Sequence, residues 1–220
     1  MLNTGLNPDI SLALAYARGD LRRPFTTLFT LDAHLGGIVA GAREPQLARI
    51  KLAWWGEQLA ALGHSAHPAD PLLIACKDLV CLYGVTPVSL SAMTRAWDAL
   101  IDDFPLSPSA LEAFAVGRGQ MFGAAVAIAS CELSPLIASA GATYALTDFA
   151  FHCSNRITAQ SALALAEKQM STQQRLYWPK PMRPFRILSA FAAFDRKAGL
   201  DGPRAIGTPR RLWHLARTLI

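Results

Sequence analysis

Apolar residues recur every three or four positions through residues 28–62, and this spacing limits the fold more than any other feature of the chain. It predicts two consecutive helices joined by a short break. The apolar positions of these helices are Leu28, Leu31, Leu35 and Ile38 in the first and Leu52, Trp55, Leu59 and Leu62 in the second. On an adjoining face of the second helix are Leu47, Ile50 and Trp54. We therefore expect both helices to pack against neighbours on more than one side.

The rest of the chain also favours helices. Alanine and leucine dominate, β-branched residues are sparse, and no run of alternating apolar and polar residues suggests a strand. Hydrophobic residues make up 52% of the chain and charged residues only 17%, so most helices must be buried on two faces. We predict an all-α fold in which residues 1–220 form a single domain.

A short tryptophan-containing segment resembles a known family. Residues 53–59, AWWGEQL, resemble the helix r-L-x-W-W-r-e-q-L of the squalene/phytoene synthase family. A weaker similarity in helix pattern extends from about Leu12 to Asp195, with a shortened C-terminal part after a segment similar to G-R-v-Y-l-P at residues 175–179. The resemblance implies an isoprenoid-synthase-like helical bundle around a central apolar cavity.

The family carries two aspartate-rich motifs, whose carboxylates hold Mg²⁺ against the substrate's phosphates. With residues 28–31 placed on the lead-in of the first motif, Gly36 and Gly37 stand at the paired aspartates and Ala40 at the third aspartate. None of these residues has a side-chain oxygen. Asp32 lies one turn earlier, and we interpret it as a solvated residue on the polar face, since one carboxylate does not replace a chelating set.

The second motif departs from the family in the same way. After a matching lead-in at residues 146–151, His152 and Arg156 stand where the two aspartates belong. A shift in register would bring Asp148 into the motif, but a lone aspartate does not rebuild it. We predict no catalytic and no metal-binding residues, and hypothesise that His152 and Arg156, one turn apart, contact a phosphate directly.

Other groups that bind metals elsewhere have simpler interpretations here. Asp98 and the pair Asp102-Asp103 fit a solvated helix end, although Asp98 and Asp102 are the candidate Mg²⁺ ligands if the chain is catalytic. His64 and His67 lie in a loop without a third ligand nearby. We expect the four cysteines to be buried free thiols, as in a reducing compartment, and they are Cys76, Cys81, Cys131 and Cys153.

Charge and hydropathy restrict the partners and the location. The net charge is +5 and the pI about 9.3, yet the basic residues are dispersed, so nucleic-acid binding is not expected. The N-terminus lacks the pattern of a signal peptide, and the longest uncharged stretch, residues 133–147, is too short for a transmembrane segment. We expect a cytoplasmic protein, or one peripheral to the inner face of the membrane. A final amphipathic helix at 208–220 would suit an anionic surface, but docking onto the body of the protein is the commoner fate of such a helix.

Three functions fit these observations. The leading one is a non-catalytic member of the family that binds a prenyl lipid or a protein partner, in the manner of the similar assembly factors of mitochondrial respiratory complex I, which also lack a complete aspartate set. The second is a prenyltransferase that joins two allylic diphosphates head to head, with Mg²⁺ as cofactor. The third is a polyprenyl carrier with an open cavity. No other cofactor is predicted.

Overall fold

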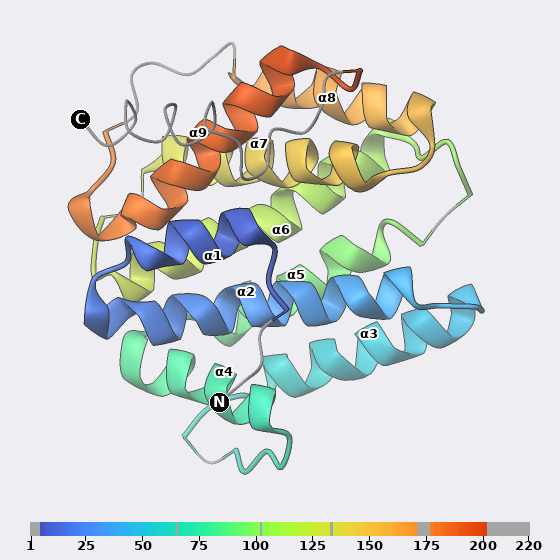
Figure 1. Ribbon diagram of the computed structural model, residues 1–220. Helices are drawn as coiled ribbons and strands as arrows, with labels where there is room; N and C mark the ends of the chain where they lie inside the picture. Colours follow the sequence, from blue (N-terminus) through green and yellow to red (C-terminus); the bar gives the residue numbers. More distant parts are fainter. Residues whose placement is uncertain (1–4, 65, 102, 133, 171–176, 202–220) are drawn as a thin grey trace.

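The computed structural model describes residues 5–64, 66–101, 103–132, 134–170 and 177–201. These residues contain no strand, so the predicted all-α fold is confirmed (Figure 1). The helices are α1 (Pro8–Ala15), α2 (Gly19–Ala40), α3 (Pro45–Ala60), α4 (Pro71–Tyr83), α5 (Pro87–Asp98), α6 (Pro108–Ile128), α7 (Pro135–His152), α8 (Arg156–Met170), the short 3₁₀ helix η1 (Lys180–Met182) and α9 (Arg183–Ala198).

The helix starts follow from local sequence signals. Proline is the first residue of six helices, where its missing N–H would have no partner in any case, and these helices are α1, α3, α4, α5, α6 and α7. In five of them the preceding side chain accepts a hydrogen bond from a backbone N–H of the first turn, and the capping residues are Asn7, Asp70, Thr86, Ser107 and Ser134. These starts are therefore specified locally.

Helices α6 and α7 pack against each other in the middle of the molecule. In Figure 1, α8 and α9 lie on one side of them, while α3 and α4 lie on the other side beyond α2 and α5. Phenylalanine rings fill the space between α2, α6 and α9. The centre of the Phe185 ring lies 5.1 Å from the ring centre of Phe25, 5.4 Å from that of Phe29 and 4.9 Å from that of Phe122. This part of the interior is occupied by side chains.

Glycines allow the central helices to approach closely. A Cβ at Gly117 would lie 2.7 Å from the Cβ of Ala96 on α5. A Cβ at Gly119 would lie 2.9 Å from the backbone nitrogen of Ala142 on α7. Both distances are too short for a side chain, so glycine at these two positions allows α6 to pack closely against α5 and α7.

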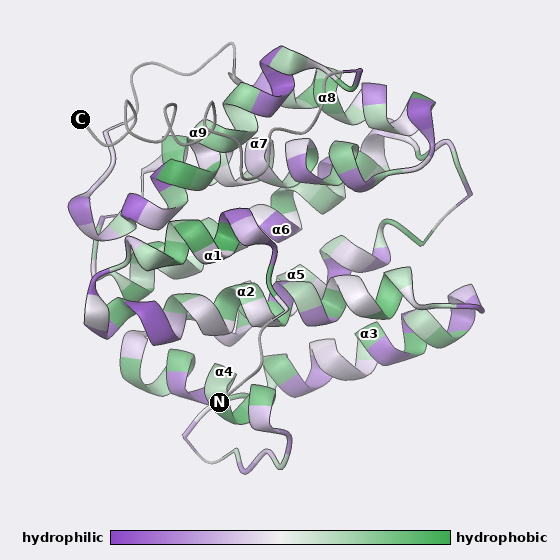
Figure 2. Cartoon of the chain, in the orientation of Figure 1, coloured by the Kyte–Doolittle hydropathy of each residue, from purple (hydrophilic) through white to green (hydrophobic). Residues whose placement is uncertain are grey.

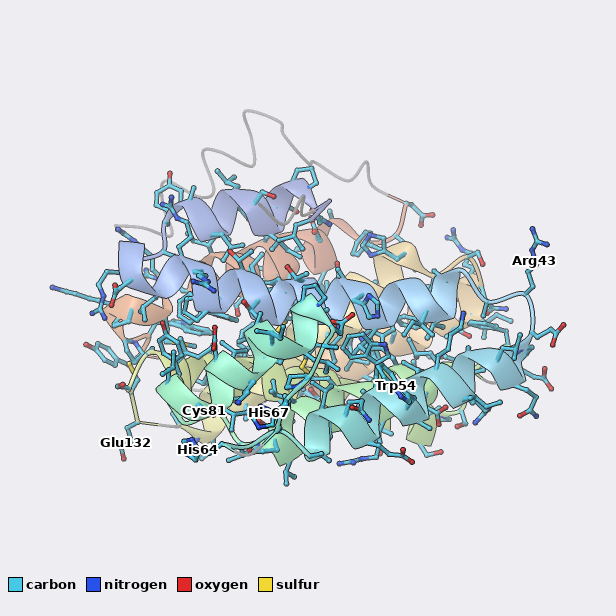
Figure 3. All side chains as sticks on the ribbon, turned by 90° about the horizontal axis from the view of Figure 1, so that it is seen from below. Arg43, Trp54, His64, His67, Cys81 and Glu132 are labelled. Atoms are coloured by element: carbon cyan, nitrogen blue, oxygen red, sulfur yellow. The ribbon has the colours of Figure 1, made fainter. Side chains whose placement is uncertain are left out.

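Helix α3 is buried on one side only. Its inward face carries Trp55 with the rest of the predicted apolar stripe, whereas Leu47, Ile50 and Trp54 are 51%, 64% and 47% exposed. Figure 3 looks onto the face formed by α3 and α4 and labels Trp54 there. The prediction that both helices of residues 28–62 pack on more than one side is therefore wrong for α3.

Hydropathy shows the same contrast between helices. In Figure 2 most of α1 is hydrophobic, whereas α3 mixes hydrophobic and hydrophilic residues along its length. No helix within the described ranges is long and apolar enough to cross a membrane. The predicted helix at 208–220 and residues 175 and 176 of the G-R-v-Y-l-P segment lie outside the described residues.

Candidate functional site

A buried arginine joins three helices at the centre of the candidate site. Arg118 lies on α6 and is only 4% exposed. Its Nε and Nη2 donate to the carboxylate of Asp32 on α2, with Nη2 2.7 Å from Oδ2, and its Nη1 donates to Oδ2 of Asp148 on α7 at 2.8 Å. One guanidinium therefore bridges two carboxylates that come from opposite parts of the chain.

Aromatic rings surround this ion cluster. The guanidinium carbon of Arg118 lies 5.2 Å from the ring centre of Trp97, 5.7 Å from Phe114 and 5.6 Å from Tyr144. The indole Nε1 of Trp97 also donates to Oδ1 of Asp32 at 3.0 Å. The rings exclude water and add cation–π attraction, so the ion pairs are held in an environment of low polarity.

The charges in the cluster depend on one another. Burial opposes the charged form of Arg118, but Asp32 and Asp148 outweigh it and hold the pKa of the guanidinium well above its usual value. Burial, together with the nearby charge of Asp148, raises the pKa of Tyr144 well above its usual range, so its hydroxyl stays neutral. Two carboxylates against one guanidinium leave the cluster with a net charge of −1.

The cluster lies beside an open groove of about 490 Å³. Its lining comes from the start of α1 and the residues before it, from α2, from the end of α5 and the connection after it, from Arg118 of α6, and from the end of α7. Most of it is apolar, including Ile10, Phe29, Val39, Leu100, Phe104 and Phe149. The charged side chains among the described lining residues are Asp32, Arg118 and Asp148. The groove thus combines an apolar wall with an ion cluster.

The residues at the first degenerate motif fall on two sides of α2. Gly36 and Ala40 line the groove, whereas Gly37 faces a separate depression between α2 and α3. A Cβ at Gly36 would lie 2.8 Å from Cη2 of Trp97. The indole of Trp97 therefore fills the space that a side chain at position 36 would need, and an aspartate there would require that ring to move.

The residues at the second degenerate motif are also separated. His152 lines the groove, with Nδ1 2.8 Å from the backbone carbonyl oxygen of Asp148 and 3.5 Å from its Oδ1. Arg156 begins the next helix, α8, and its Nη2 lies 2.7 Å from Oδ1 of Asp201. Of the pair, only His152 is among the described residues that line the groove. A phosphate contact by these two residues stays a prediction.

The interpretation of Asp32 as a solvated residue is wrong, because the residue is 3% exposed and its carboxylate is bound by Arg118 and Trp97. The sequence did contain a signal: Asp32 follows Leu28 by four residues and precedes Leu35 by three, which places it on the inward stripe of α2. An inward carboxylate needs a cation, and Arg118 is a charged residue within an apolar, glycine-rich helix.

The other candidate ligands lie elsewhere. Asp98 ends α5 and pairs with Arg49 of α3 at 3.6 Å, with both side chains partly exposed, while Asp102 lies outside the described residues. The four cysteines are free thiols; Cys76 is buried and the other three are half-buried, so the expected burial holds fully for Cys76 only. In the described ranges, no three His, Cys, Asp or Glu side chains are grouped as metal ligands.

The donor set around Arg118 does not fit Mg²⁺. This ion takes about six oxygen ligands in a near-octahedral arrangement, several of them carboxylate or phosphate oxygens. Among the described residues that line the groove, the carboxylates are Asp32 and Asp148, and both are already bound by Arg118. A metal ion between them would be placed against the guanidinium, so we derive no metal-dependent step for this site.

The family model described as squalene/phytoene synthase matches residues 7–128, more than half of the 220 residues. This chain belongs to the squalene/phytoene synthase family. Neither the curated proteins nor the solved structures that were compared include a match. The matched residues extend from the start of α1 to the end of α6, so they include Asp32 and Arg118 but not Asp148.

Proposed function

We propose that this member of the squalene/phytoene synthase family is non-catalytic and binds a prenyl lipid in the groove beside Arg118. The observation that carries the proposal is the guanidinium between α2 and α7. By the family resemblance, these are the helices whose aspartates would hold Mg²⁺. Here a fixed side-chain cation joins the remaining carboxylates.

The chemistry of the family's reaction supports this proposal. Ionisation of an allylic diphosphate leaves a strongly charged leaving group, which cations must neutralise. The charge of Arg118 is already balanced by Asp32 and Asp148, and its N–H groups point to those carboxylates. Among its described residues, the site therefore has no unbalanced positive charge that could stabilise a departing diphosphate, while its apolar wall still suits a prenyl chain.

Calorimetric titration with farnesyl diphosphate, with and without Mg²⁺, tests the proposal when the same mixtures are assayed for products. We expect binding that does not depend on Mg²⁺ and no product, with an active enzyme of the family as positive control for the assay. Metal-dependent binding together with a condensed product would establish the alternative, a prenyl-diphosphate transferase. If the diphosphate does not bind, the same titration with farnesol shows whether the groove takes prenyl chains at all.

A protein partner is the second candidate function, and the exposed face of α3 favours it. Leu47, Ile50 and Trp54 form a stripe along this helix, and apolar side chains grouped in this way often mark an interface. By analogy with the assembly factors, the partner would belong to a respiratory complex, with the protein peripheral to the inner face of the membrane. A Trp54→Arg variant that lost its partner but kept lipid binding would separate the two functions.

The predicted phosphate contact of His152 and Arg156 has its own test. If these residues bind a diphosphate, an Arg156→Ala variant should bind farnesyl diphosphate more weakly than the unmodified protein. Because Arg156 lies in an exposed ion pair with Asp201, the substitution should leave the fold intact. If the variant bound farnesyl diphosphate as tightly as the unmodified protein does, the predicted phosphate contact would be wrong.

A further inference from the structure

The charged side chains along the groove indicate which kind of head group its ligand has. We propose that the groove selects a prenyl lipid with an uncharged head group that can donate a hydrogen bond, such as a prenyl alcohol, over the corresponding diphosphate. This inference rests on the proposed lipid-binding function, and it names the class of ligand within it.

The charge of the groove has the same sign as the charge of a diphosphate. Among the described residues that line the groove, the charged side chains are Asp32, Asp148 and Arg118, which together carry −1 when His152 is counted as neutral. A diphosphate brings several negative charges. In a groove of low polarity, repulsion between like charges is screened less than in water, so a diphosphate is disfavoured there relative to an uncharged head group.

Arg118 cannot turn to a phosphate at low cost. Its Nε and Nη2 are bound to Asp32, and its Nη1 to Asp148. A phosphate that captured the guanidinium would leave Asp32, which is almost completely buried, without its counter-ion. Separating a buried ion pair is strongly unfavourable, so the existing bonds hold Arg118 in place.

The groove presents a hydrogen-bond acceptor, the carboxylate of Asp148. Asp148 lines the groove and its side chain is 18% exposed, whereas the Asp32 side chain is only 4% exposed. A carboxylate has about four lone-pair positions, so Asp148 can accept a hydrogen bond from a hydroxyl group while it keeps Arg118. A hydroxyl group therefore matches this end of the groove.

The apolar wall of the groove suits a prenyl chain. The aromatic rings of Phe29, Phe104 and Phe149 and the aliphatic chains of Ile10, Val39 and Leu100 line the same space. Its volume of about 490 Å³ lies within the range of pockets that hold small ligands. A chain of isoprene units would bury its methyl groups against these side chains, with the head group at Asp148.

Titration of the full-length protein with farnesol and with farnesyl diphosphate, both without Mg²⁺, tests the inference. The two ligands share the same chain, so their difference reports on the head group. We expect farnesol to bind at least about tenfold more tightly at low salt. We also expect the ratio to shrink as salt is added, since salt screens the repulsion of the diphosphate.

Two variants separate the groove charge from the overall charge. Asp148→Asn removes one negative charge from the groove and should move the affinity ratio toward the diphosphate. Asp78→Asn is the matched control, because it removes one negative charge from α4, where Asp78 pairs with Arg23 on the surface. It should leave the ratio unchanged. Circular dichroism and thermal melting confirm that both variants are folded.

The outcomes distinguish the inference from the function on which it rests. Equal or tighter binding of the diphosphate by the unmodified protein overturns the inference but leaves lipid binding intact. A ratio that changes equally in both variants also overturns it, since the groove charge would then have no special role. Binding of neither ligand overturns the lipid-binding function itself.

Discussion

Arg118 is a structural counter-ion whose removal or release has consequences for stability. It neutralises two carboxylates on two other helices and is enclosed by three aromatic rings. Such a cluster adds little to stability compared with well-packed apolar side chains, but a broken cluster is costly, because the remaining buried charge has lost its partner. The cluster therefore acts mainly to specify how α2, α6 and α7 meet.

An Asp32→Asn substitution should lower the free energy of unfolding by about 3–5 kcal/mol, because Arg118 would keep only Asp148 as a charged partner. Urea denaturation followed by circular dichroism measures this loss. The control is Asp78→Asn, which breaks an exposed pair with Arg23 and should cost about 1 kcal/mol or less. Equal losses in the two variants would contradict the structural role of the cluster.

Cys76 gives a prediction about pH. Burial raises the pKa of this thiol to about 12, whereas its ordinary value is 9.0. Between these values the unfolded chain loses the thiol proton and the folded chain keeps it, so stability falls as pH rises from about 9 toward 12. A Cys76→Ala variant should lose stability less steeply over this range, by at most about 1.4 kcal/mol per pH unit. Urea denaturation at several pH values measures this difference. If the stability of the variant and of the unmodified protein fell equally with pH, the loss could not be assigned to the Cys76 thiol.

The helices themselves were predictable because their signals are local. The spacing of apolar residues acts within a few turns of chain and indicated the two helices of residues 28–62, which are the later part of α2 and α3. The prolines at the first position of six helices are local signals of the same kind. The outer face of α3 was not predictable in this way. Apolar residues at helical spacing show which positions share a face, but Leu47 and Trp54 show that they do not reveal whether another element covers it.

The candidate site was less predictable for a related reason. Arg118 is separated from Asp32 by 86 residues and from Asp148 by 30, so no local pattern joins them. The family resemblance directed attention to Gly36, Gly37 and Ala40, the positions where aspartates are absent. The carboxylates that the protein retains lie elsewhere on the same two helices, and a three-dimensional arrangement was needed to bring them to one arginine.

Close packing of α6 gives a prediction in which two similar substitutions have opposite effects. Gly117→Ala places a Cβ 2.7 Å from the Cβ of Ala96 and 2.9 Å from the carbonyl oxygen of Ala92, so it should destabilise the protein by about 1–3 kcal/mol. Gly123→Ala meets nothing closer than 3.8 Å, at the side chain of Gln120. It should stabilise the protein by up to about 1 kcal/mol, because alanine favours the helix.

Thermal denaturation of both variants measures these effects. The two substitutions add the same methyl group to the same helix, so differences in helix propensity largely cancel and the contrast isolates packing. If both variants were stabilised, the contact between α5 and α6 would be looser than the structure indicates.

The molecule's core extends beyond the part that matches the family. Residues 7–128 end with α6, yet α7 packs along α6 and contributes buried Ile137, Tyr144 and Leu146. Helix α9 contributes Phe185, which contacts rings of both α2 and α6. Apolar surface on the first six helices is therefore covered by helices that follow in the chain.

We consequently expect residues 1–220 to fold as one cooperative unit and a fragment of residues 1–128 not to fold alone. The fragment would expose Phe122 and leave Arg118 without Asp148, so it loses both apolar burial and a charged partner. It should bind a hydrophobic dye and melt without a cooperative transition, whereas the full chain should melt in one step. Co-expression with residues 129–220 is the control, since it should restore the transition. A cooperative melt of residues 1–128 alone would show instead that the matched part is an independent domain.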